Sequence, residues 1–200
     1  SNEDLFHQDA LLKSVEGALA AIKKASSKIN LVWAVGAPLR VDCRLFNCAV
    51  VFYRGNILGI AVKSYLPNYR EYYESRQFSP ASQAMATTVS LAGQKDIPFG
   101  ANLIFQATNV KNMQLYFEIC EDVWVPVPPS SFAAMAGATV IGNLSASNIT
   151  VGKSEYRHQL IANQSARCVA AYLYADAGFG ESTTDLAWDG HAMIYENGNL

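Results

Sequence analysis

The sequence predicts an α/β fold with mixed sheets, and this expectation rests on its hydrophobic pattern and its composition. Short apolar segments of strand length alternate along the chain with longer segments of helical periodicity, as is typical of α/β domains. Two of the apolar segments are joined by a tight turn, so antiparallel strand pairs are expected beside parallel ones. Half of the 200 residues are hydrophobic, which is enough for one domain with a sizeable core.

The first half of the chain is expected to contain a helix, a strand and a hairpin. The helix runs to about Ala25, because apolar residues recur at helical spacing at Leu5, Leu12, Val15, Leu19 and Ile22. A buried strand follows at 31–36 and ends before Pro38, and 48–66 forms a hairpin that turns at 54–56. The stretch 77–100 is rich in Ser, Ala, Thr and Gln and is expected to be a mobile loop.

The second half of the chain is expected to alternate strands with helices. Helical segments are predicted at 130–137 and from 155 to about 166. Strands are predicted at 101–106, 115–119, 138–143, 169–174 and 190–195. Crossovers through helices join parallel strands, so this half contributes the parallel part of the predicted sheets.

The charge content excludes some classes of function. Charged residues make up 16% of the chain, which indicates extensive burial and predicts a homo-oligomer or a neighbouring domain. The net charge is −2 without a run of lysine or arginine, so neither nucleic acid nor an anionic membrane is an expected partner. No apolar stretch reaches the ~18 residues of a membrane span and no signal peptide opens the chain, so a cytoplasmic location is expected.

The cysteines and histidines predict neither disulfides nor a metal site. The cysteines are even in number, but a chain of this length without a secretion signal rarely relies on disulfides, so they are expected to be free thiols. His7, His158 and His191 are scattered, and none lies at ligand spacing from a cysteine. No metal is therefore expected.

Cys120 is the candidate nucleophile. It ends an alternating segment at 115–119 and is followed at once by acidic residues and a proline-rich turn, a pattern that predicts a strand delivering a thiol to a turn. The alternative is that Cys120 packs as a small buried hydrophobic residue. Glu118, Glu121 and Asp122 would raise the pKa of its thiol above the ordinary ~8.5, so a reactive Cys120 needs a cation from elsewhere in the chain.

Lys63 is the best candidate for that cation. It directly follows the apolar second arm of the predicted hairpin, where a lysine is either a surface residue at a strand end or a buried cation. An aromatic and charged stretch at 65–74 comes next. Such a loop either lines a pocket for a polar ligand or forms an ordered surface.

Four segments together resemble a known family. The segments are 63–71 (KSYLPNYRE), 118–122 (EICED), 143–153 (NLSASNITVGK) and 180–190 (GESTTDLAWDG). They resemble, in the same order and over nearly the whole chain, the glutaminase domain of glutamine-dependent NAD synthetase. That domain belongs to the nitrilase superfamily, so the resemblance implies a nitrilase-like α-β-β-α sandwich and a Glu-Lys-Cys catalytic triad.

The resemblance also implies roles for individual residues. Cys120 is the expected nucleophile, Lys63 the catalytic lysine, and Glu71 a second glutamate that positions the lysine. The thiolate would attack the side-chain amide of glutamine, form a thioester and release ammonia, with Lys63 and a backbone N–H near Glu121 stabilising the oxyanion. Water would then release glutamate. The residues expected to bind the substrate are Tyr69, Glu121, Ser147 and Lys153.

Two parts of the family's enzyme are not expected within residues 1–200. The resemblance places the general-base glutamate in a segment before Ser1, so no residue here is assigned that role. It also implies a separate synthetase domain that uses ATP to amidate deamido-NAD, while this domain itself needs no cofactor. The chain is therefore expected to be a single domain over 1–200, truncated at both ends, with its activity lowered by roughly 10²–10⁴-fold when alone.

Two other functions stay open on the sequence alone. One is a stand-alone nitrilase-type amidase that acts on a different amide, which a comparison of glutamine with short aliphatic amides would reveal. The other is a non-catalytic module that keeps the sandwich for assembly, and an unreactive Cys120 with intact self-association would favour it. A purely structural module does not need a thiol among three carboxylates, so the glutaminase prediction ranks first.

Overall fold

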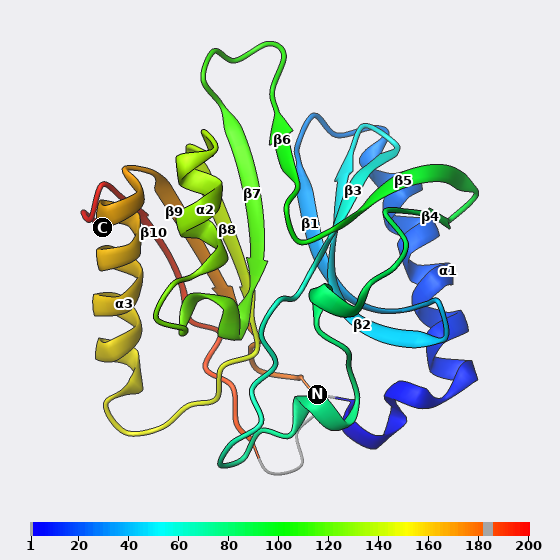
Figure 1. The fold of residues 1–200 in the computed structure, drawn as a ribbon, viewed down its shortest axis with the longest axis horizontal. Coiled ribbons are helices and arrows are strands. Elements are labelled where there is room, and N and C mark those ends of the chain that lie inside the picture. The colour runs from blue at the N-terminus through cyan, green and yellow to red at the C-terminus, as the bar shows by residue number, and fades with distance from the viewer. Residues whose placement is uncertain (1, 182–185) are drawn as a thin grey trace. The chain divides into compact units, whose positions relative to one another are not determined.

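The computed structural model describes residues 2–181 and 186–200 of the chain. It contains two compact units, residues 2–103 and residues 104–200, here termed the N-terminal unit and the C-terminal unit. Each unit has one five-stranded sheet that combines parallel and antiparallel neighbours, as the sequence predicts (Figure 1). The single domain predicted over 1–200 stays a prediction. None of the described helices is long and apolar enough to cross a membrane.

The N-terminal unit packs one long helix against its sheet. The strands are β1 (Trp33–Val41), β2 (Arg44–Tyr53), β3 (Asn56–Val62), β4 (Thr88–Leu91) and β5 (Gln94–Gly100), in the spatial order β1-β2-β3-β5-β4. Helix α1 (Asp9–Ser26) follows the 3₁₀ helix η1 (Glu3–His7), and η2 (Glu74–Arg76) and η3 (Ala81–Gln83) are further 3₁₀ turns. Helix α1 lies beside this sheet (Figure 1). Its apolar face buries Leu19 in one core with sheet residues that include Phe52 and Ile60. The predicted helix is confirmed from Asp9 onwards, whereas Leu5, expected on its apolar stripe, lies in η1 and is exposed.

The predicted hairpin at 48–66 is confirmed as β2 and β3. The two strands pair antiparallel and Tyr53 faces Asn56 across the turn. The turn residues Arg54 and Gly55 both have positive φ angles, 45° and 81°, which is the geometry of the tight turns that match strand twist. Gly55 also lies close to α1, since a Cβ there would come within 3.1 Å of the Ser27 Cβ.

The first strand is longer than the sequence pattern predicts. The expected strand at 31–36 was to end before Pro38, but β1 runs to Val41 and pairs Pro38 with Asn47 of β2. β1 is an edge strand, as the sheet order shows. Because only one side of an edge strand must donate hydrogen bonds, a proline is tolerated there without ending the strand.

The prediction of a mobile loop at 77–100 is wrong, because this stretch contains the β4–β5 hairpin. Val89 pairs with Ile97 and Leu91 with Gln94, across a turn at Ala92 and Gly93 with positive φ angles. The buried side chains that hold the hairpin in the core are Leu91, Ile97 and Phe99. These apolar positions are few and lie among small polar residues and a proline, so the alternation is too sparse to recognise.

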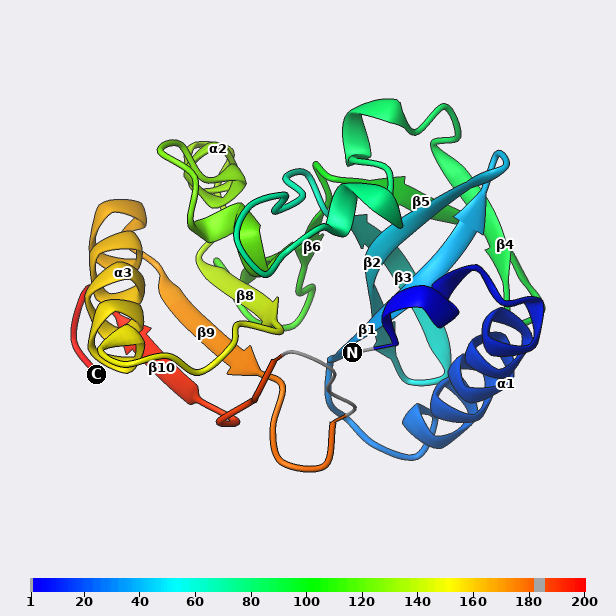
Figure 2. The same cartoon turned by 90° about the horizontal axis from the view of Figure 1, so that it is seen from below.

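The C-terminal unit is a second five-stranded sheet with two helices on one face. Its strands are β6 (Ile104–Gln106), β7 (Gln114–Ile119), β8 (Val140–Ser145), β9 (Ala171–Asp176) and β10 (Ala192–Glu196), in the order β10-β9-β8-β7-β6. The two helices are α2 (Pro129–Met135) and α3 (Lys153–Cys168), and η4 (Cys120–Val123) is a 3₁₀ turn. Both α2 and α3 cover the same face of the sheet (Figure 2). There Ala133 of α2 and Ile161 of α3 join one core with Tyr172. The strands and helices predicted for this half are confirmed, with shifted ends.

The three central strands of this unit position its polar side chains. β7, β8 and β9 are parallel, and their register places Glu118 beside Asn143 and Asn143 beside Tyr174. In parallel strands such partners point to the same face of the sheet. Glu118, Asn143 and Tyr174 therefore form a row near the carboxyl ends of the strands, the edge at which α/β proteins place their binding sites.

Candidate active site

Cys120 directly follows β7 and begins the 3₁₀ helix η4, which confirms the predicted strand that delivers a thiol to a turn. The residue is buried and 8% exposed. Its φ angle is +46°, in the left-handed region that residues with a Cβ seldom adopt. Such a conformation costs of order 1–3 kcal/mol and persists only where surrounding contacts hold it.

The side chain of Asn143 contacts both polar main-chain groups of Cys120. The Cys120 N–H donates to Asn143 Oδ1 at 3.2 Å, and Asn143 Nδ2 lies 3.5 Å from the Cys120 carbonyl oxygen as donor. Ser145 Oγ also donates to Oδ1 at 2.7 Å. Since Asn143 is only 2% exposed, these contacts form without competition from bulk water. They fix the main chain of Cys120 relative to β8.

The buried carboxylate of Glu118 is linked to the Asn143 amide through Tyr172. Tyr172 OH donates to Glu118 Oε1, and the Ser130 N–H donates to Glu118 Oε2 at 2.9 Å. Asn143 Nδ2 in turn donates to the Tyr172 hydroxyl oxygen at 3.2 Å. Burial raises the pKa of Glu118 to about 7, although the hydrogen bond from Tyr172 acts in the opposite direction. Glu118, Tyr172 and Asn143 thus form a hydrogen-bonded path to Cys120.

Tyr174 is the other phenol near Cys120. Burial raises the pKa of Tyr174, and the negative charges of Asp176 and Cys120 raise it further. Tyr174 therefore stays neutral at physiological pH and lies within electrostatic reach of the Cys120 sulfur. Asp122, one of the acidic residues next to the thiol in the sequence, also has a structural contact, because it accepts a hydrogen bond from the Ile119 N–H at 3.0 Å.

Three of the predicted substrate-binding residues belong to the C-terminal unit. Glu121 follows Cys120 in η4 and is half-buried, and Ser147 is 2% exposed just after β8. Lys153 begins α3, and its Nζ donates to Asn148 Oδ1 at 2.5 Å and lies 5.5 Å from the centre of the Trp124 ring. Their role in binding a substrate stays a prediction.

Arg157 anchors the segment that carries Ser147. This arginine of α3 is fully buried, and its Nη2 donates to the carbonyl oxygens of Ser147 and Asn148 at 2.8 and 2.9 Å. It forms ion pairs with Asp176, at 3.3 Å, and Asp189, at 2.6 Å. Asp176 also accepts the Ser147 N–H at 2.8 Å. The Ser147 segment is therefore tied to α3, β9 and the 189 region at once.

Lys63 lies in the N-terminal unit and is a buried cation. It follows β3 directly, and its side chain is 3% exposed, so of the two alternatives for this lysine the buried one is correct. Its Nζ forms an ion pair with Glu74, and Asn47 Nδ2 donates to the other oxygen of that carboxylate at 2.7 Å. Glu74 thus holds the ammonium group in a fixed place.

The loop after Lys63 carries the remaining predicted residues. Glu71 is half-buried and Tyr69 is 51% exposed, with the Tyr69 and Tyr72 ring centres 6.4 Å apart. Glu74 of the same loop forms an ion pair with Lys63, and the positioning role that the resemblance gives to Glu71 stays a prediction. The N-terminal unit therefore holds Lys63, Tyr69 and Glu71, and the C-terminal unit holds Cys120, Glu121, Ser147 and Lys153.

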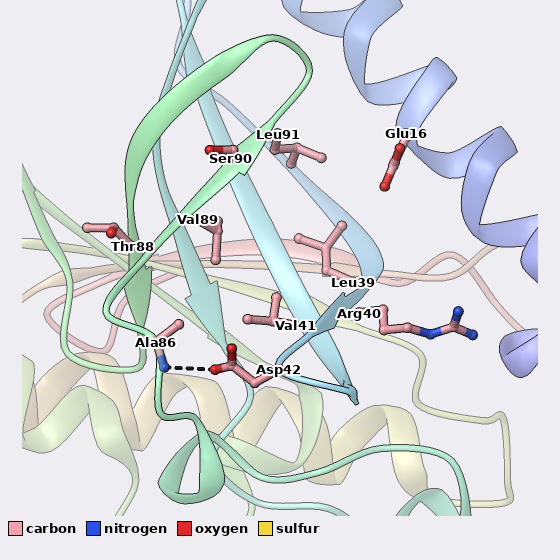
Figure 3. A pocket seen from close by; sticks show the side chains of 10 residues that line it. All are labelled: Glu16, Leu39, Arg40, Val41, Asp42, Ala86, Thr88, Val89, Ser90 and Leu91. Carbon is pink, nitrogen blue, oxygen red and sulfur yellow. Dashed lines mark hydrogen bonds between the residues drawn. The ribbon is translucent and has the colours of Figure 1, made fainter.

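A pocket of about 280 Å³ lies elsewhere in the N-terminal unit. Figure 3 shows that Leu39 and Val41 of β1 and Val89 of β4 line it, and that the Ala86 N–H donates to Asp42 Oδ2, at 3.0 Å. The predicted site residues are absent from its lining. Within the described residues, no group of His, Cys, Asp and Glu side chains is placed to hold a metal ion.

The sequence matches the Carbon-nitrogen hydrolase family over residues 2–197. The chain belongs to this family. Carbon-nitrogen hydrolase relatives include the glutamine-dependent NAD(+) synthetase of Mycobacterium tuberculosis, which is 52% identical over 200 residues, all of this chain and 29% of that protein. The chain thus spans less than a third of the length of this relative.

Solved structures of other proteins share the fold. The crystal structure of a glutamine-dependent NAD(+) synthetase from Cytophaga hutchinsonii superposes with a TM-score of 0.81 at 30% identity, covering 99% of this chain and 31% of that one. An amidase from Nesterenkonia sp. gives a TM-score of 0.71 at 16% identity, over 99% of this chain and 65% of that one, which supports the fold alone. The predicted nitrilase-like α/β fold class and the resemblance to glutamine-dependent NAD synthetases are confirmed.

Several residues of the candidate site escape prediction from the sequence. Asn143 lies within a segment that carries the family resemblance, but nothing in its spacing marks it as a contact of Cys120. Glu74 lies in the aromatic and charged loop, where the pairing with Lys63 has no local signal. Tyr172 and Arg157 read as ordinary residues of a strand and a helix. The motif at 180–190 includes residues 182–185, which lie outside the described residues.

Proposed function

We propose that the chain is the glutamine-hydrolysing portion of a glutamine-dependent NAD synthetase. The observation that carries the proposal is the 52% identity to such a synthetase over all 200 residues. The geometry of Cys120 supports it, because this thiol follows a central parallel strand at the edge where α/β proteins place their sites. Its main chain is also held by Asn143 on both sides.

The proposed chemistry begins with the thiolate of Cys120. It attacks the carbon of the glutamine side-chain amide, and the resulting tetrahedral oxyanion collapses to a thioester as ammonia leaves. Water then hydrolyses the thioester and releases glutamate. The proposal assigns oxyanion stabilisation to Lys63 and to a main-chain N–H at Glu121. What supports Lys63 in this role is that its buried charge pairs with Glu74, whose carboxylate also accepts a hydrogen bond from Asn47.

The remaining predicted residues receive binding roles. Tyr69, Glu121, Ser147 and Lys153 are proposed to contact glutamine, and Glu71 to help position Lys63. Burial of Ser147 and its anchoring through Arg157 support this assignment, because a substrate contact must be held in place to discriminate between amides.

The partners of this activity belong to the same proposal. Ammonia released from glutamine would serve a synthetase domain that uses ATP to amidate deamido-NAD, while the described chain itself uses no cofactor. The relatives' greater length supports a further domain, since this chain spans 29% of the Mycobacterium tuberculosis enzyme. A homo-oligomer in the cytoplasm is proposed as well, and the charge content of 16% supports the oligomer.

The decisive experiment labels Cys120 with an electrophile that mimics glutamine. The chain is exposed to a diazoketone analogue of glutamine with and without competing glutamine, and adducts are located by intact-mass and peptide mass spectrometry. One adduct on Cys120 that glutamine suppresses is expected, and a Cys120→Ser variant is the control. Absence of an adduct, or an adduct that glutamine does not suppress, would contradict the proposal.

A second measurement separates glutamine from other amides. Glutamine is expected to protect Cys120 at lower concentration than short aliphatic amides, because Tyr69, Glu121, Ser147 and Lys153 are proposed to bind its amino-acid end. Equal or stronger protection by a short aliphatic amide would instead indicate a stand-alone amidase.

A further inference from the structure

One side chain, that of Asn143, contacts both main-chain polar groups of Cys120. The left-handed φ of +46° turns its N–H and carbonyl groups out of the β7 ladder, and Asn143 contacts both of them. We propose that Asn143 is a positioning residue that holds Cys120 in this conformation, and that Tyr172 fixes the orientation of the Asn143 amide. The inference rests on the proposed function, because it takes Cys120 as the nucleophile that attacks glutamine.

The oxygen of the Asn143 side-chain amide is surrounded by hydrogen-bond donors, and its nitrogen by acceptors. Oδ1 accepts hydrogen bonds from the Cys120 N–H and from Ser145 Oγ, at 3.2 and 2.7 Å. Nδ2 donates towards the Cys120 carbonyl oxygen and to the Tyr172 hydroxyl oxygen, at 3.5 and 3.2 Å. Turning the amide over would place the oxygen against two acceptors and the NH₂ against an N–H donor. The surroundings therefore select one orientation of the amide.

Tyr172 determines which orientation the Asn143 amide adopts. Its hydroxyl proton is donated to Glu118, so its lone pairs are the part of the group that faces Asn143 Nδ2. Glu118 is held in turn by the Ser130 N–H at 2.9 Å, and both Tyr172 and Glu118 are buried. The phenol consequently presents an acceptor to Asn143, and the amide then presents its oxygen to the Cys120 N–H.

Loss of the Asn143 side chain should shift the Cys120 sulfur while leaving the binding of substrate nearly unchanged. The Cys120 main chain would relax towards a commoner conformation, and its sulfur would shift from the position that attack on the amide carbon requires. A displacement of ~1 Å can cost on the order of 10²-fold in rate even when binding is little changed. The maximal rate of labelling by the diazoketone analogue of glutamine should therefore fall, while its half-saturating concentration stays nearly constant.

The test uses Asn143→Ala, Tyr172→Phe and the double variant. Asn143→Ala is expected to lower the maximal labelling rate of Cys120 by about 10–100-fold, and Tyr172→Phe by a smaller factor. The double variant should be no slower than Asn143→Ala, since Tyr172 acts through Asn143. The hydrogen exchange of the Cys120 N–H, measured by NMR, should be about 10-fold or more faster in Asn143→Ala because its acceptor is gone.

The matched control is Gln94→Ala. Gln94 makes the same kind of contact in the N-terminal unit, where its side-chain amide accepts the Ile57 N–H at 2.9 Å and donates to the Ile57 carbonyl oxygen at 2.7 Å. This variant should lower the free energy of unfolding without changing the labelling rate of folded protein. A comparable loss of labelling in Gln94→Ala would show that Asn143→Ala acts through stability, and it would overturn the positioning role.

The outcomes separate this inference from the proposed function. If the unmodified chain is not labelled at all, the proposed function fails, and the exchange of the Cys120 N–H still decides whether Asn143 holds the main chain. Faster exchange in Asn143→Ala together with an unchanged labelling rate would overturn the positioning role. An unchanged exchange rate would overturn the hydrogen-bonding basis of the inference, whatever Cys120 reacts with.

Discussion

Replacement of Arg157 by methionine tests how strongly the Ser147 segment depends on one buried cation. Methionine keeps most of the volume and removes the charge and all the N–H donors. Both Arg157 and the side chain of Asp176 are fully buried, so the carboxylate would lose its cation without gaining water. Removing one partner of a buried ion pair costs about 3–5 kcal/mol, so Arg157→Met should lose about that much free energy of unfolding.

The pH dependence gives this prediction a second signature. Burial already raises the pKa of Asp176, and loss of Arg157 removes a cation that holds it down. A carboxyl group whose pKa is raised in the folded state contributes its stability below the unfolded pKa and loses it as pH rises through the folded pKa. The difference in free energy of unfolding between Arg157→Met and the unmodified chain should therefore become smaller as pH is lowered towards about 4.

The assay is urea unfolding at several pH values, followed by circular dichroism, with the midpoint and slope fitted separately. The variant Asp176→Asn/Arg157→Met should lose less than the sum of the two single variants, with a coupling of about 1–3 kcal/mol. Arg40→Met is the control, since Arg40 pairs with Asp9 at the surface and its loss should change stability little. A loss below about 1 kcal/mol in Arg157→Met, or one independent of pH, would refute the reasoning.

Three further predictions concern a buried carboxylate, a close approach and the helix core. Burial raises the pKa of Glu118 to about 7, so the unmodified chain should lose roughly 3 kcal/mol of stability between about pH 4.5 and pH 7, and Glu118→Gln should flatten this slope in urea titrations. A steeper slope in the variant would contradict it. A Cβ on Gly142 would lie 2.7 Å from the Phe117 ring, so Gly142→Ala should cost about 1–3 kcal/mol, whereas Gly36→Ala, with open space around it, should be nearly neutral. Equal unfolding midpoints for the two variants would argue against overpacking. Leu19 is 3% exposed in the core beneath α1, so Leu19→Ala should cost about 2–5 kcal/mol in the same assay, and a loss under about 1 kcal/mol would show that this core is not formed as described.

Sequence patterns predict those parts of the fold that depend on neighbouring residues. The helix at α1, the β2–β3 hairpin and the strand that delivers Cys120 all follow from local periodicity and turn residues, which act over a few positions. The pattern fails where local and tertiary preferences disagree. Pro38 stays within β1 because the strand lies at an edge, and β4 and β5 form because a few apolar residues reach the core.

The sequence by itself determined the α/β class, the family and the place of the candidate thiol at the end of a strand. Only the tertiary structure decided which partners hold the charged and reactive groups. Asn143 meets Cys120 because β7 and β8 pair in a particular parallel register, and Arg157 meets Asp176 because α3 packs over β9. Such contacts join residues far apart in the chain. No local periodicity predicts them. They form because burying a polar or charged group without a hydrogen-bond partner costs free energy.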